Sequence, residues 1–278
     1  MDTHCFLPNR LYCVIGWPLT QTLSPLLHNT GFQTLAIPAV YLKFQVKPND
    51  LARFVESVRL LPIAGCSVTI PHKTAIIPYL DRISPKARLL GAVNTLTLDG
   101  ETLSGDNTDI LGFLAPLASY TLSSMRILLL GSGGAARAVR GGLTEKNARH
   151  ISIATQSDTS HKALANEFGA EPVSWMNRHK VQADVVINAT PLGMHGAFES
   201  ETPYHFDEAL NLPDLVYDIV YNPLWTRFLK DAKERGIQCI SGREMFFEQG
   251  NAQFTLWTGK NLPHAARTAL DRALDSEK

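Results

Sequence analysis

A short apolar run ends in a cluster of glycines, and a helix-forming segment follows at once. The run is Arg126–Leu130 and the cluster is Gly131-Ser-Gly-Gly-Ala-Ala-Arg137. Gly131 allows a tight turn, Gly133 lets the backbone approach a phosphate, and Ala136 stands where a small residue packs helix against strand. The N–H groups that open such a helix favour phosphate oxygens. A plain strand-to-helix turn can contain similar glycines, but strand, turn and helix in this order predict a Rossmann dinucleotide-binding domain.

Short apolar runs alternate with helix-period segments along most of the chain, a pattern typical of a parallel sheet with helices on its faces. The expected strands are Leu11–Ile15, Val40–Phe44, Cys66–Thr69, Arg126–Leu130, His150–Ala154, Val185–Asn188, Leu215–Ile219 and Ile237–Ile240. The expected helices are Pro25–Ala36, Asn49–Leu60, Pro85–Leu90, Ala135–Glu145, Ser160–Phe168, Thr226–Arg235 and Arg243–Trp257. Asp99-Gly100 favours a hairpin turn between Thr95–Leu98 and Thr102–Ser104. We therefore predict a two-lobe α/β protein: an N-terminal α/β lobe with a mainly parallel sheet, a Rossmann lobe, and a cleft between them.

The last expected helix carries one candidate polar residue. Met245, Gln249, Ala252 and Leu256 fall on one stripe of this helix, with Gln249 as its lone polar member. A polar side chain on an apolar stripe usually has a hydrogen-bond partner. Gln249 is therefore a candidate contact to a ligand, and satisfaction by the backbone is the alternative.

Composition narrows the class of partner. The 278 residues include 26 Lys plus Arg and 26 Asp plus Glu, so no net charge attracts nucleic acid or an anionic membrane. The four cysteines are scattered, which favours free buried thiols in a reducing compartment. The histidines show no metal-ligand spacing. No basic and apolar leader and no membrane-length apolar run is evident. We expect a cytoplasmic protein with a small-molecule partner, with no metal, nucleic acid or membrane.

The residues after the second Rossmann strand leave the choice of dinucleotide open. An acidic side chain there would bind the ribose of NAD, and an arginine would bind the 2′-phosphate of NADP. The chain has Thr155-Gln156-Ser157 at this point, with Asp158 and then His161-Lys162 downstream. Neither signature is present.

Six further motifs, in order along the chain, are similar to those of the shikimate dehydrogenase family. They are Ile15-Gly-Trp-Pro-Leu-Thr-Gln-Thr-Leu-Ser-Pro-Leu-Leu-His-Asn29, Ser67-Val-Thr-Ile-Pro-His-Lys73, Gly91-Ala-Val-Asn-Thr95, Gly105-Asp-Asn-Thr-Asp109, Asn188-Ala-Thr-Pro-Leu-Gly-Met194 and Ser241-Gly-Arg-Glu-Met-Phe-Phe-Glu-Gln249. The resemblance runs from about Leu11 to Trp257 and surrounds the glycine turn. It implies reversible reduction of 3-dehydroshikimate to shikimate with NADPH, on the route through chorismate to the aromatic amino acids.

The resemblance also implies a division of labour along the chain. Residues 1–108 with 242–278 would form the substrate-binding catalytic domain, and residues 109–241 the dinucleotide-binding domain. Lys73 and Asp109 would be the catalytic dyad. The implied substrate contacts are Thr22, Ser24, Ser67, Thr69, Asn94, Tyr221 and Gln249. The implied cofactor contacts are Gly131, Ser132, Gly133, Gly134, Ala135, Thr155, Gln156, Ser157, Ala189, Thr190, Pro191, Gly242 and Met245.

The chain departs from the family's pattern in three respects. Gln21-Thr22 stands where His-Ser is usual, so an extra methyl lies next to the substrate carboxylate. Ser67 stands where asparagine is common, although plant-type members have serine there. Thr155-Gln156-Ser157 and Ser160 replace the Asn-Arg-Thr clamp and a further arginine that bind the 2′-phosphate. The family default is NADP, and the missing clamp leaves NAD open.

The chemistry of carbonyl reduction suits Lys73 and Asp109. A hydride adds to carbon, and a donor must meet the charge that develops on oxygen and deliver a proton. Pro71 fits the first position of a helix, which would place Lys73 in the first turn, where the helix dipole disfavours an ammonium and so favours proton release. Asp109 would orient the ammonium, although it could instead cap a helix that begins at Ile110. Ser24, before Pro25, could likewise cap the first helix.

Other functions remain compatible with these residues. A close relative acting on quinate, or on both acids, with NAD would differ near Thr22 and Ser67. A nucleotide-sensing regulator on the same scaffold would not need to keep Lys73, Asp109 and Asn94 together. A folate-type dehydrogenase has two lobes as well, but not these motifs. Either a monomer or a homodimer is compatible with the sequence.

Overall fold

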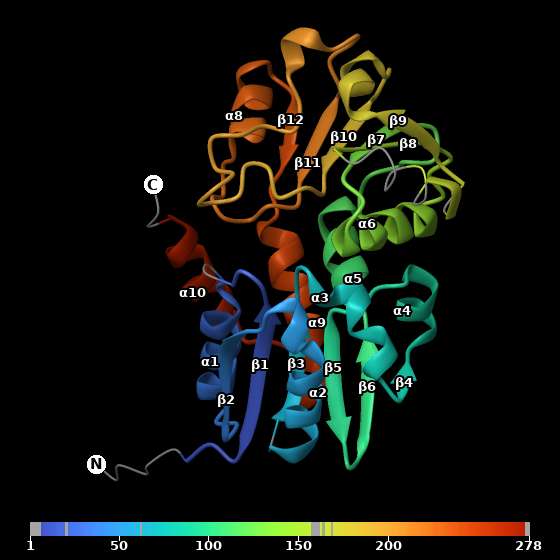
Figure 1. The fold of residues 1–278 in the computed structure, drawn as a ribbon. Coiled ribbons are helices and arrows are strands. Elements are labelled where there is room, and N and C mark those ends of the chain that lie inside the picture. The colour runs from blue at the N-terminus through green and yellow to red at the C-terminus, as the bar shows by residue number, and fades with distance from the viewer. Residues whose placement is uncertain are drawn as a thin grey trace. The chain divides into compact units, whose positions relative to one another are not determined.

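The computed structural model describes residues 7–19, 22–61, 63–156, 162, 165–167 and 169–275, and they form two compact units (Figure 1). The first unit holds the described residues of Met1–Thr108 and Gln249–Ser276. The second holds those of Asp109–Glu248. The division falls within one long helix, α9 (Arg243–Thr258), between Glu248 and Gln249, whereas the sequence predicted the return at residue 242.

The first unit is built on a six-stranded sheet in the order β2-β1-β3-β5-β6-β4. Its strands are β1 (Arg10–Gly16), β2 (Ala39–Gln45), β3 (Ile63–Val68), β4 (Arg82–Ile83), β5 (Thr95–Asp99) and β6 (Thr102–Asp106). Strands β2, β1 and β3 run parallel, and β5 joins β3 and β6 in antiparallel pairs. The predicted hairpin at Asp99-Gly100 is confirmed: Asp99 pairs with Thr102 across the turn.

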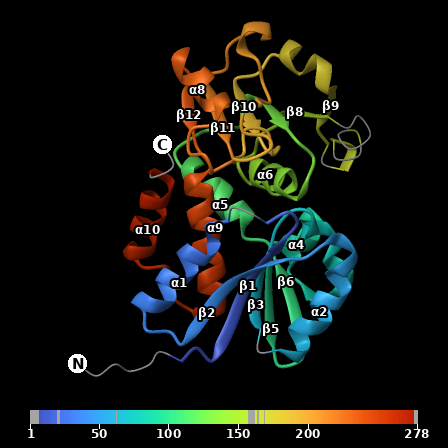
Figure 2. The ribbon, with the colours of Figure 1, turned by 60° about the vertical axis from the view of Figure 1, so that its left-hand side comes forward.

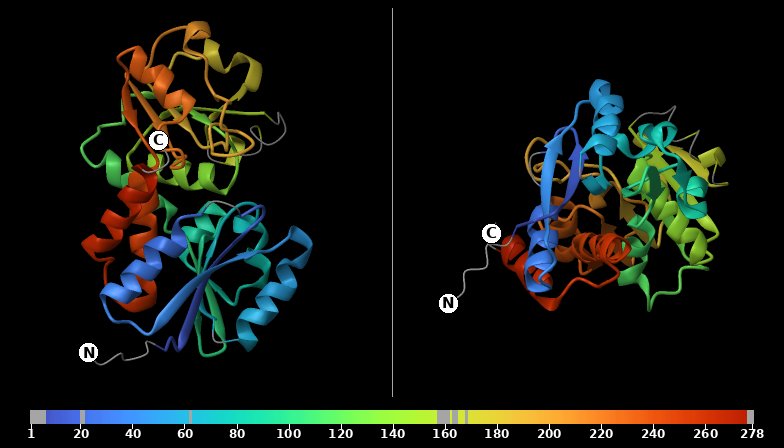
Figure 3. Two further views of the ribbon diagram at one scale, coloured as in Figure 1. Left: turned by 90° about the vertical axis from the view of Figure 1, so that its left-hand side faces the viewer. Right: turned by 90° about the horizontal axis from the view of Figure 1, so that it is seen from below.

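Helices cover both faces of this sheet (Figure 2). They are α1 (Ser24–Thr34), α2 (Leu51–Leu60), α3 (His72–Ala75), α4 (Pro85–Leu90), α9 and α10 (His264–Asp275), with single 3-10 turns at Pro48–Asp50 and Ile77–Tyr79. Figure 3 shows α1, α9 and α10 on one face and α2 on the other. Because side chains alternate along a strand, Tyr12 packs against Phe32 and Trp257, while Cys13 and Ile15 pack in the opposite core.

The second unit is a parallel sheet in the order β12-β11-β10-β7-β8-β9. Its strands are β7 (Arg126–Leu130), β8 (His150–Thr155), β9 (Glu171–Ser174), β10 (Val185–Asn188), β11 (Leu215–Asp218) and β12 (Gln238–Ile240). Every adjacent pair is parallel. Counted from the far edge, this is the 3-2-1-4-5-6 order of a Rossmann sheet, so the fold predicted from the glycine turn is confirmed.

Strand alternation divides the core of the second unit into two layers. Ile127 and Leu129 pack with α5 (Asp109–Leu114) and α6 (Gly134–Glu145), whereas Leu128 and Leu130 pack with α8 (Arg227–Glu234) on the other face. Single 3-10 segments lie at Ala115–Leu117, Trp175–Lys180 and Phe206–Glu208. Ala136 is fully buried against the strands, as its position in the glycine motif predicted.

Most predicted elements occur close to their predicted bounds, but β4, β9 and α10 were not predicted. The helix predicted at Ser160–Phe168 lies mostly outside the described residues. Cys13 and Cys66 are buried free thiols, and Cys239 is a half-buried one. Among the helices that the structure describes, none is long and apolar enough to span a membrane.

Candidate active site

Two of the predicted substrate residues of the first unit, Ser67 and Asn94, belong to one buried network of hydrogen bonds. The hydroxyl of Tyr41 donates to Ser67 Oγ at 2.6 Å, and Ser67 Oγ donates to Oε1 of Gln253 at 2.7 Å. The Gln253 amide donates to the carbonyl oxygen of Asn94 and to Thr95 Oγ1 at 3.1 and 3.0 Å. Ser67 and Asn94 are far apart in the chain, and the side chain of Gln253 in helix α9 joins them.

Asn94 in turn holds the segment that leads to Asp109. Its Oδ1 accepts from the Thr108 backbone N–H at 2.8 Å and from Thr95 Oγ1 at 2.7 Å, and its Nδ2 donates to Thr108 Oγ1 at 3.0 Å. Asn107 Nδ2 donates to the carbonyl oxygen of Ala92 at 2.9 Å. The motifs at 91–95 and 105–109 are therefore locked together by buried side chains.

Lys73 is anchored to the same segment by its backbone. The N–H of Val93 donates to the Lys73 carbonyl oxygen at 2.7 Å, and the lysine is half-buried. The prediction for Pro71 was wrong, because this proline precedes α3, which spans only His72–Ala75. Lys73 does lie in the first turn, but so short a helix aligns few peptide dipoles and gives it little field.

Asp109 follows Thr108 directly and begins α5. The residue is 4% exposed. The alternative that it caps a helix beginning at Ile110 does not match these bounds, since the helix begins at Asp109 itself. A carboxylate in the first turn of a helix interacts favourably with the unpaired N–H groups there.

Two hydroxyls stand at the start of α1, where the resemblance expects a carboxylate. Thr22 Oγ1 accepts from the Ser24 backbone N–H at 3.2 Å and donates to Ser24 Oγ at 3.1 Å. Ser24 was expected as the cap, but it is the first residue of the helix, and Thr22 satisfies the N–H group instead. Thr69 is half-buried just after β3, with its N–H bonded to the Ile15 carbonyl oxygen.

The stripe predicted on α9 was wrong by one position. Leu256 is 49% exposed, whereas Phe246, Gln253, Phe254 and Trp257 are buried. The polar member of the buried stripe is therefore Gln253. Gln249, the residue at which the first unit resumes along the chain, is half-buried. A stripe drawn through Phe246, Gly250, Gln253 and Trp257, at helical spacing, would have found it.

His28 lies in the apolar layer next to this network. Its ring stacks on Tyr41 with centroids 4.5 Å apart, and both ring nitrogens lack a hydrogen-bond partner among the described residues. Burial lowers the pKa of His28 to about 3, with nearby Gln253 opposing the shift only in part. His72 Nε2 bonds the Val46 carbonyl oxygen at 2.7 Å. Both histidines are buried within the first unit, His28 among aromatic rings and His72 against the backbone.

In the second unit, the predicted cofactor residues gather where the strand order reverses. Strands β7 and β10 are neighbours there, and Gly131 and Ala189 follow their ends. Gly131 has φ +117°, and a Cβ on it would lie 2.7 Å from the Ala189 carbonyl oxygen, so only glycine fits. A Cβ on Gly133 would meet nothing within 4 Å. The turn is thus tightly packed at Gly131 and open at Gly133. Such a turn fits a pyrophosphate on the N-terminus of α6.

Neighbouring residues complete this half of the site. Ser132 Oγ donates to Thr155 Oγ1 at 3.3 Å, at the end of β8, and Gln156 is exposed beside them. Thr190 donates its N–H and hydroxyl to Asn188 Oδ1 at 3.0 and 2.6 Å, which shapes the loop that also contains Pro191. Gly134 and Ala135 are half-buried in the first turn of α6. Ser157 lies outside the described residues.

Three predicted residues follow β11 and β12 in the same unit. The Gly242 N–H donates to the Val220 carbonyl oxygen at 3.2 Å, and a Cβ on Gly242 would lie 2.3 Å from the carbonyl oxygen of Ile219. Tyr221 stacks on Phe246 with ring centroids 4.0 Å apart. Met245 packs in the core with α5 and α6 and is 6% exposed.

One buried acid in this region escaped the sequence analysis. Asp218, fully buried at the end of β11, accepts from Asn188 Nδ2 at 2.9 Å, from the Val220 N–H at 3.0 Å and from Thr226 Oγ1 at 2.6 Å. Burial raises the pKa of Asp218 to about 7, against the lowering effect of these three bonds. The carboxyl group ties the loop after β10 to the loop after β11.

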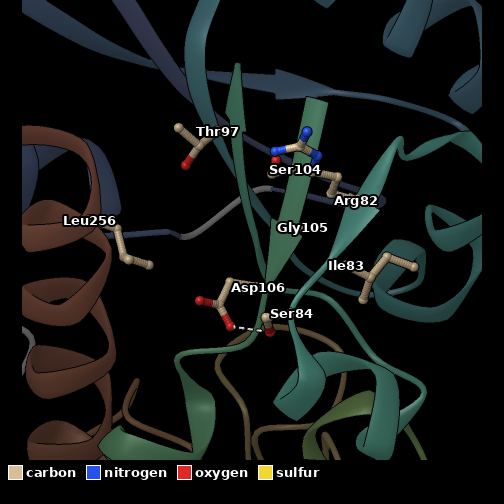
Figure 4. A pocket seen from close by; sticks show the side chains of 8 residues that line it. All are labelled: Arg82, Ile83, Ser84, Thr97, Ser104, Gly105, Asp106 and Leu256. Atoms are coloured by element: carbon tan, nitrogen blue, oxygen red, sulfur yellow. Dashed lines mark hydrogen bonds between the residues drawn. The ribbon is translucent and has the colours of Figure 1, made fainter. Parts of the chain in front are cut away.

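A separate surface pocket of about 300 Å³ lies in the first unit, over β4, β5 and β6 (Figure 4). Its lining residues are Arg82, Ile83, Ser84, Thr97, Ser104, Gly105, Asp106 and Leu256. Ser84 Oγ donates to Asp106 Oδ1 at 2.6 Å within it. It contains none of the predicted site residues. Within the described ranges, no group of His, Cys, Asp and Glu is suited to hold a metal ion.

Comparison with known proteins identifies the family. A model described as the shikimate dehydrogenase substrate binding domain matches residues 14–96, and one described as shikimate / quinate 5-dehydrogenase matches residues 114–198. The chain belongs to the shikimate dehydrogenase family. Shikimate dehydrogenase (NADP(+)) of Pelobacter propionicus is 48% identical over 272 residues, which cover 97% of this chain and 98% of that protein. Its counterpart in Oleidesulfovibrio alaskensis is 44% identical, over 95% of each chain.

Solved structures of the shikimate dehydrogenase family have the same fold. Shikimate 5-dehydrogenase of Thermus thermophilus, in complex with NADP(H) and shikimate, matches with a TM-score of 0.84 and 33% identity, over 95% of this chain and all of that one. A shikimate dehydrogenase in complex with NADP+ matches with a TM-score of 0.86 and 33% identity, over 95% and 96% of the two chains. The two-domain α/β architecture predicted from the sequence is thus confirmed.

Proposed function

We propose that this protein is a shikimate dehydrogenase that reversibly reduces 3-dehydroshikimate to shikimate with NADPH, in the biosynthesis of chorismate and the aromatic amino acids. The observation that carries the proposal is family membership across both domains, with 48% identity to an NADP-dependent shikimate dehydrogenase over 97% of the chain. The unit that ends at Thr108 and resumes at Gln249 is the substrate-binding domain. The unit Asp109–Glu248 binds the dinucleotide.

Local anchoring supports the roles of Lys73 and Asp109. The carbonyl of Lys73 is bonded to Val93, the next residue, Asn94, bonds Thr108, and Asp109 follows Thr108 in the chain. One short segment of the substrate domain therefore anchors the backbone on both sides of the dyad. From this anchored backbone, the Lys73 ammonium can donate a proton to the substrate carbonyl oxygen, and the Asp109 carboxylate can orient that ammonium and accept from the neighbouring substrate hydroxyl.

The remaining residues bind and orient. Thr22 and Ser24 hold the substrate carboxylate at the start of α1, and Ser67, Thr69, Asn94, Tyr221 and Gln249 contact its hydroxyls or ring. The glycine turn binds the pyrophosphate, and the other predicted cofactor residues bind the rest of the dinucleotide, with Gly242 and Met245 near the nicotinamide. NADPH, when bound, supplies the hydride that adds to the carbonyl carbon. Lys73 supplies the proton that the oxygen gains, and in the reverse direction it takes that proton back, so the reaction balances.

Turnover of Lys73→Met tests the catalytic assignment. Because the methionine cannot donate a proton, kcat should fall by roughly a hundredfold or more, the typical contribution of a general acid. The affinity for NADP should not change. Lys260→Met, an exposed lysine of the same unit, is the matched control and should keep wild-type kcat. A Lys73→Met enzyme with near-native kcat at every pH would refute the role of Lys73.

An assay of two acids with two cofactors tests the substrate and cofactor together. Purified protein is offered shikimate or quinate, each with NADP or NAD, and reduced cofactor is followed by absorbance. We expect the highest kcat/KM with shikimate and NADP. Activity with quinate and NAD alone would identify the related quinate enzyme. Cofactor binding without turnover of either acid would identify a regulator.

We further propose that the enzyme is cytoplasmic and is a monomer or a homodimer. Sedimentation would distinguish the two oligomeric states.

A further inference from the structure

We infer that Gln253 is a positioning residue that makes Ser67 a hydrogen-bond acceptor toward the substrate. This inference rests on the proposed function, because Ser67 acts in it as a substrate contact. Gln253 does not itself reach the substrate in this scheme, because its amide oxygen and both of its amide hydrogens are bonded to Ser67, Asn94 and Thr95. Its effect on the reaction passes through the Ser67 hydroxyl.

The orientation of the Gln253 amide follows from its neighbours. The carbonyl oxygen of Asn94 can only accept a hydrogen, so the atom 3.1 Å from it must be the nitrogen Nε2. The oxygen Oε1 therefore faces Ser67, at 2.7 Å. Nε2 has two hydrogens, and both are used, one on Asn94 and one on Thr95 Oγ1.

The direction of the Ser67 hydroxyl follows in turn. An amide oxygen has no hydrogen to donate, so Ser67 must donate its only hydrogen to Oε1 of Gln253. Tyr41 then donates to Ser67, at 2.6 Å, and fills one of the two lone pairs on the serine oxygen. The lone pair that remains on Ser67 Oγ can only accept a hydrogen bond. A substrate group that meets Ser67 must therefore be a donor, which a ring hydroxyl is and a carboxylate or keto oxygen is not.

The other end of the network has the same fixed direction. Thr95 Oγ1 accepts from Gln253, so its own hydrogen goes to Asn94 Oδ1, at 2.7 Å. That oxygen also accepts from the Thr108 backbone N–H, an obligate donor, which excludes a flipped Asn94 amide. Two backbone groups, the Asn94 carbonyl and the Thr108 N–H, thus set every hydrogen from Ser67 to Asn94. Gln253 is the link through which they act.

Two substitutions separate this role from simple packing. Gln253→Met keeps the length of the side chain but frees the Ser67 hydrogen, so the KM for 3-dehydroshikimate should rise roughly tenfold, the equivalent of one hydrogen bond. In a Ser67→Ala background the same substitution should add little, because the group through which it acts is gone. Gln238→Met, an exposed glutamine of the other unit, is the matched control and should leave KM and kcat unchanged.

Gln253→Glu adds a readout that a packing role would not affect. Its carboxylate would face the Asn94 carbonyl oxygen without a hydrogen, whereas the protonated acid restores a donor there and still accepts from Ser67. Activity of this variant should therefore recover as pH falls, relative to wild type. In the wild type, burial lowers the pKa of His28 to about 3 and raises that of Tyr41 far above neutrality, so neither group titrates near neutral pH before the carboxylate is introduced.

The outcomes distinguish the inference from the function on which it rests. Wild-type turnover with a coupled Gln253–Ser67 cycle and acid recovery of Gln253→Glu supports both. Wild-type turnover with fully additive effects of Gln253→Met and Ser67→Ala, or with the same relative pH profile for Gln253→Glu and wild type, overturns the inference alone. A wild type that turns over neither acid removes both. Circular dichroism and NADP affinity, which depends on the other unit, show whether each variant is folded.

Discussion

Replacing Asp218 by asparagine should change the pH dependence of stability in a defined direction. Asp218 is buried, and its carboxyl group accepts three hydrogen bonds, from Asn188, Val220 and Thr226. Asparagine has nearly the same shape and resembles the protonated acid: its oxygen can accept from Asn188 and Val220, and its amide can donate to Thr226. The variant therefore keeps the packing of the two loops and removes only the ionisation.

The sign and size follow from the pKa of Asp218, which burial raises from 3.8 to about 7. Below pH 3.8 the carboxyl is protonated in both the folded and the unfolded chain and contributes nothing. As pH rises toward 7, the unfolded chain ionises first, so wild type loses stability relative to the variant. A pKa difference of about three units corresponds to about 4 kcal/mol. The free energy of unfolding of wild type should fall by this amount relative to Asp218→Asn once the pH is above 7.

Urea unfolding of both proteins between pH 4 and pH 8 measures this difference, and the carboxyl carbon signal of Asp218 in NMR gives its pKa directly. Asp184→Asn is a control of opposite sign, because the hydrogen bond from Arg126 lowers the pKa of Asp184. The ionised Asp184 of wild type stabilises the fold above pH 3.8, and this stabilisation is lost as the pH falls through the lowered pKa of Asp184. The difference in free energy of unfolding between wild type and Asp218→Asn could instead stay constant with pH, or change in favour of wild type as the pH rises. Either result would mean that the three hydrogen-bond donors outweigh burial, and the reasoning would be wrong.

Two further pairs of substitutions test the core and the glycine turn. Gly131→Ala should destabilise the protein by about 1–3 kcal/mol and weaken NADP binding, because φ at this position is +117° and the new Cβ would meet the Ala189 carbonyl. Gly133→Ala should weaken NADP binding only. Calorimetry measures the stability of both variants, and titration with NADP measures their affinity. Tyr217→Phe should leave the unfolding temperature unchanged, since its buried hydroxyl has no partner among the described residues, whereas Phe113→Ala, which removes the ring stacked on Tyr217, should cost about 3–5 kcal/mol. A loss for Tyr217→Phe as large as that for Phe113→Ala would contradict this account.

Elements with a clear period or turn signal could be predicted from the sequence. The strands at Arg126–Leu130 and Val185–Asn188 occur at their predicted bounds, because each is a continuous apolar run in the middle of a sheet. Strands β4 and β9 were missed for the complementary reason. β4 is only two residues long, and β9 is an edge strand containing Pro172, so pairing with a neighbour rather than local sequence makes them strands.

Helix α10 was missed although its buried residues Ala266, Leu270 and Leu274 have helical spacing, so the sequence did contain that signal. For α9 the helix was predicted but its buried stripe was not. Apolar residues occur nearly all round α9, so its period alone did not determine which stripe is buried. Packing against the sheet, with Trp257 Nε1 bonded to the Leu96 carbonyl oxygen at 3.0 Å, determined it and buried Gln253.

The sequence by itself determined the family, the two domains and the glycine turn, because these depend on motifs that are continuous along the chain. Tertiary structure alone decided which polar side chains are buried together. Gln253 with Ser67, and Asp218 with Asn188, are far apart in sequence, and the hydrogen-bond directions and raised pKa that follow exist only once folding removes water from around them.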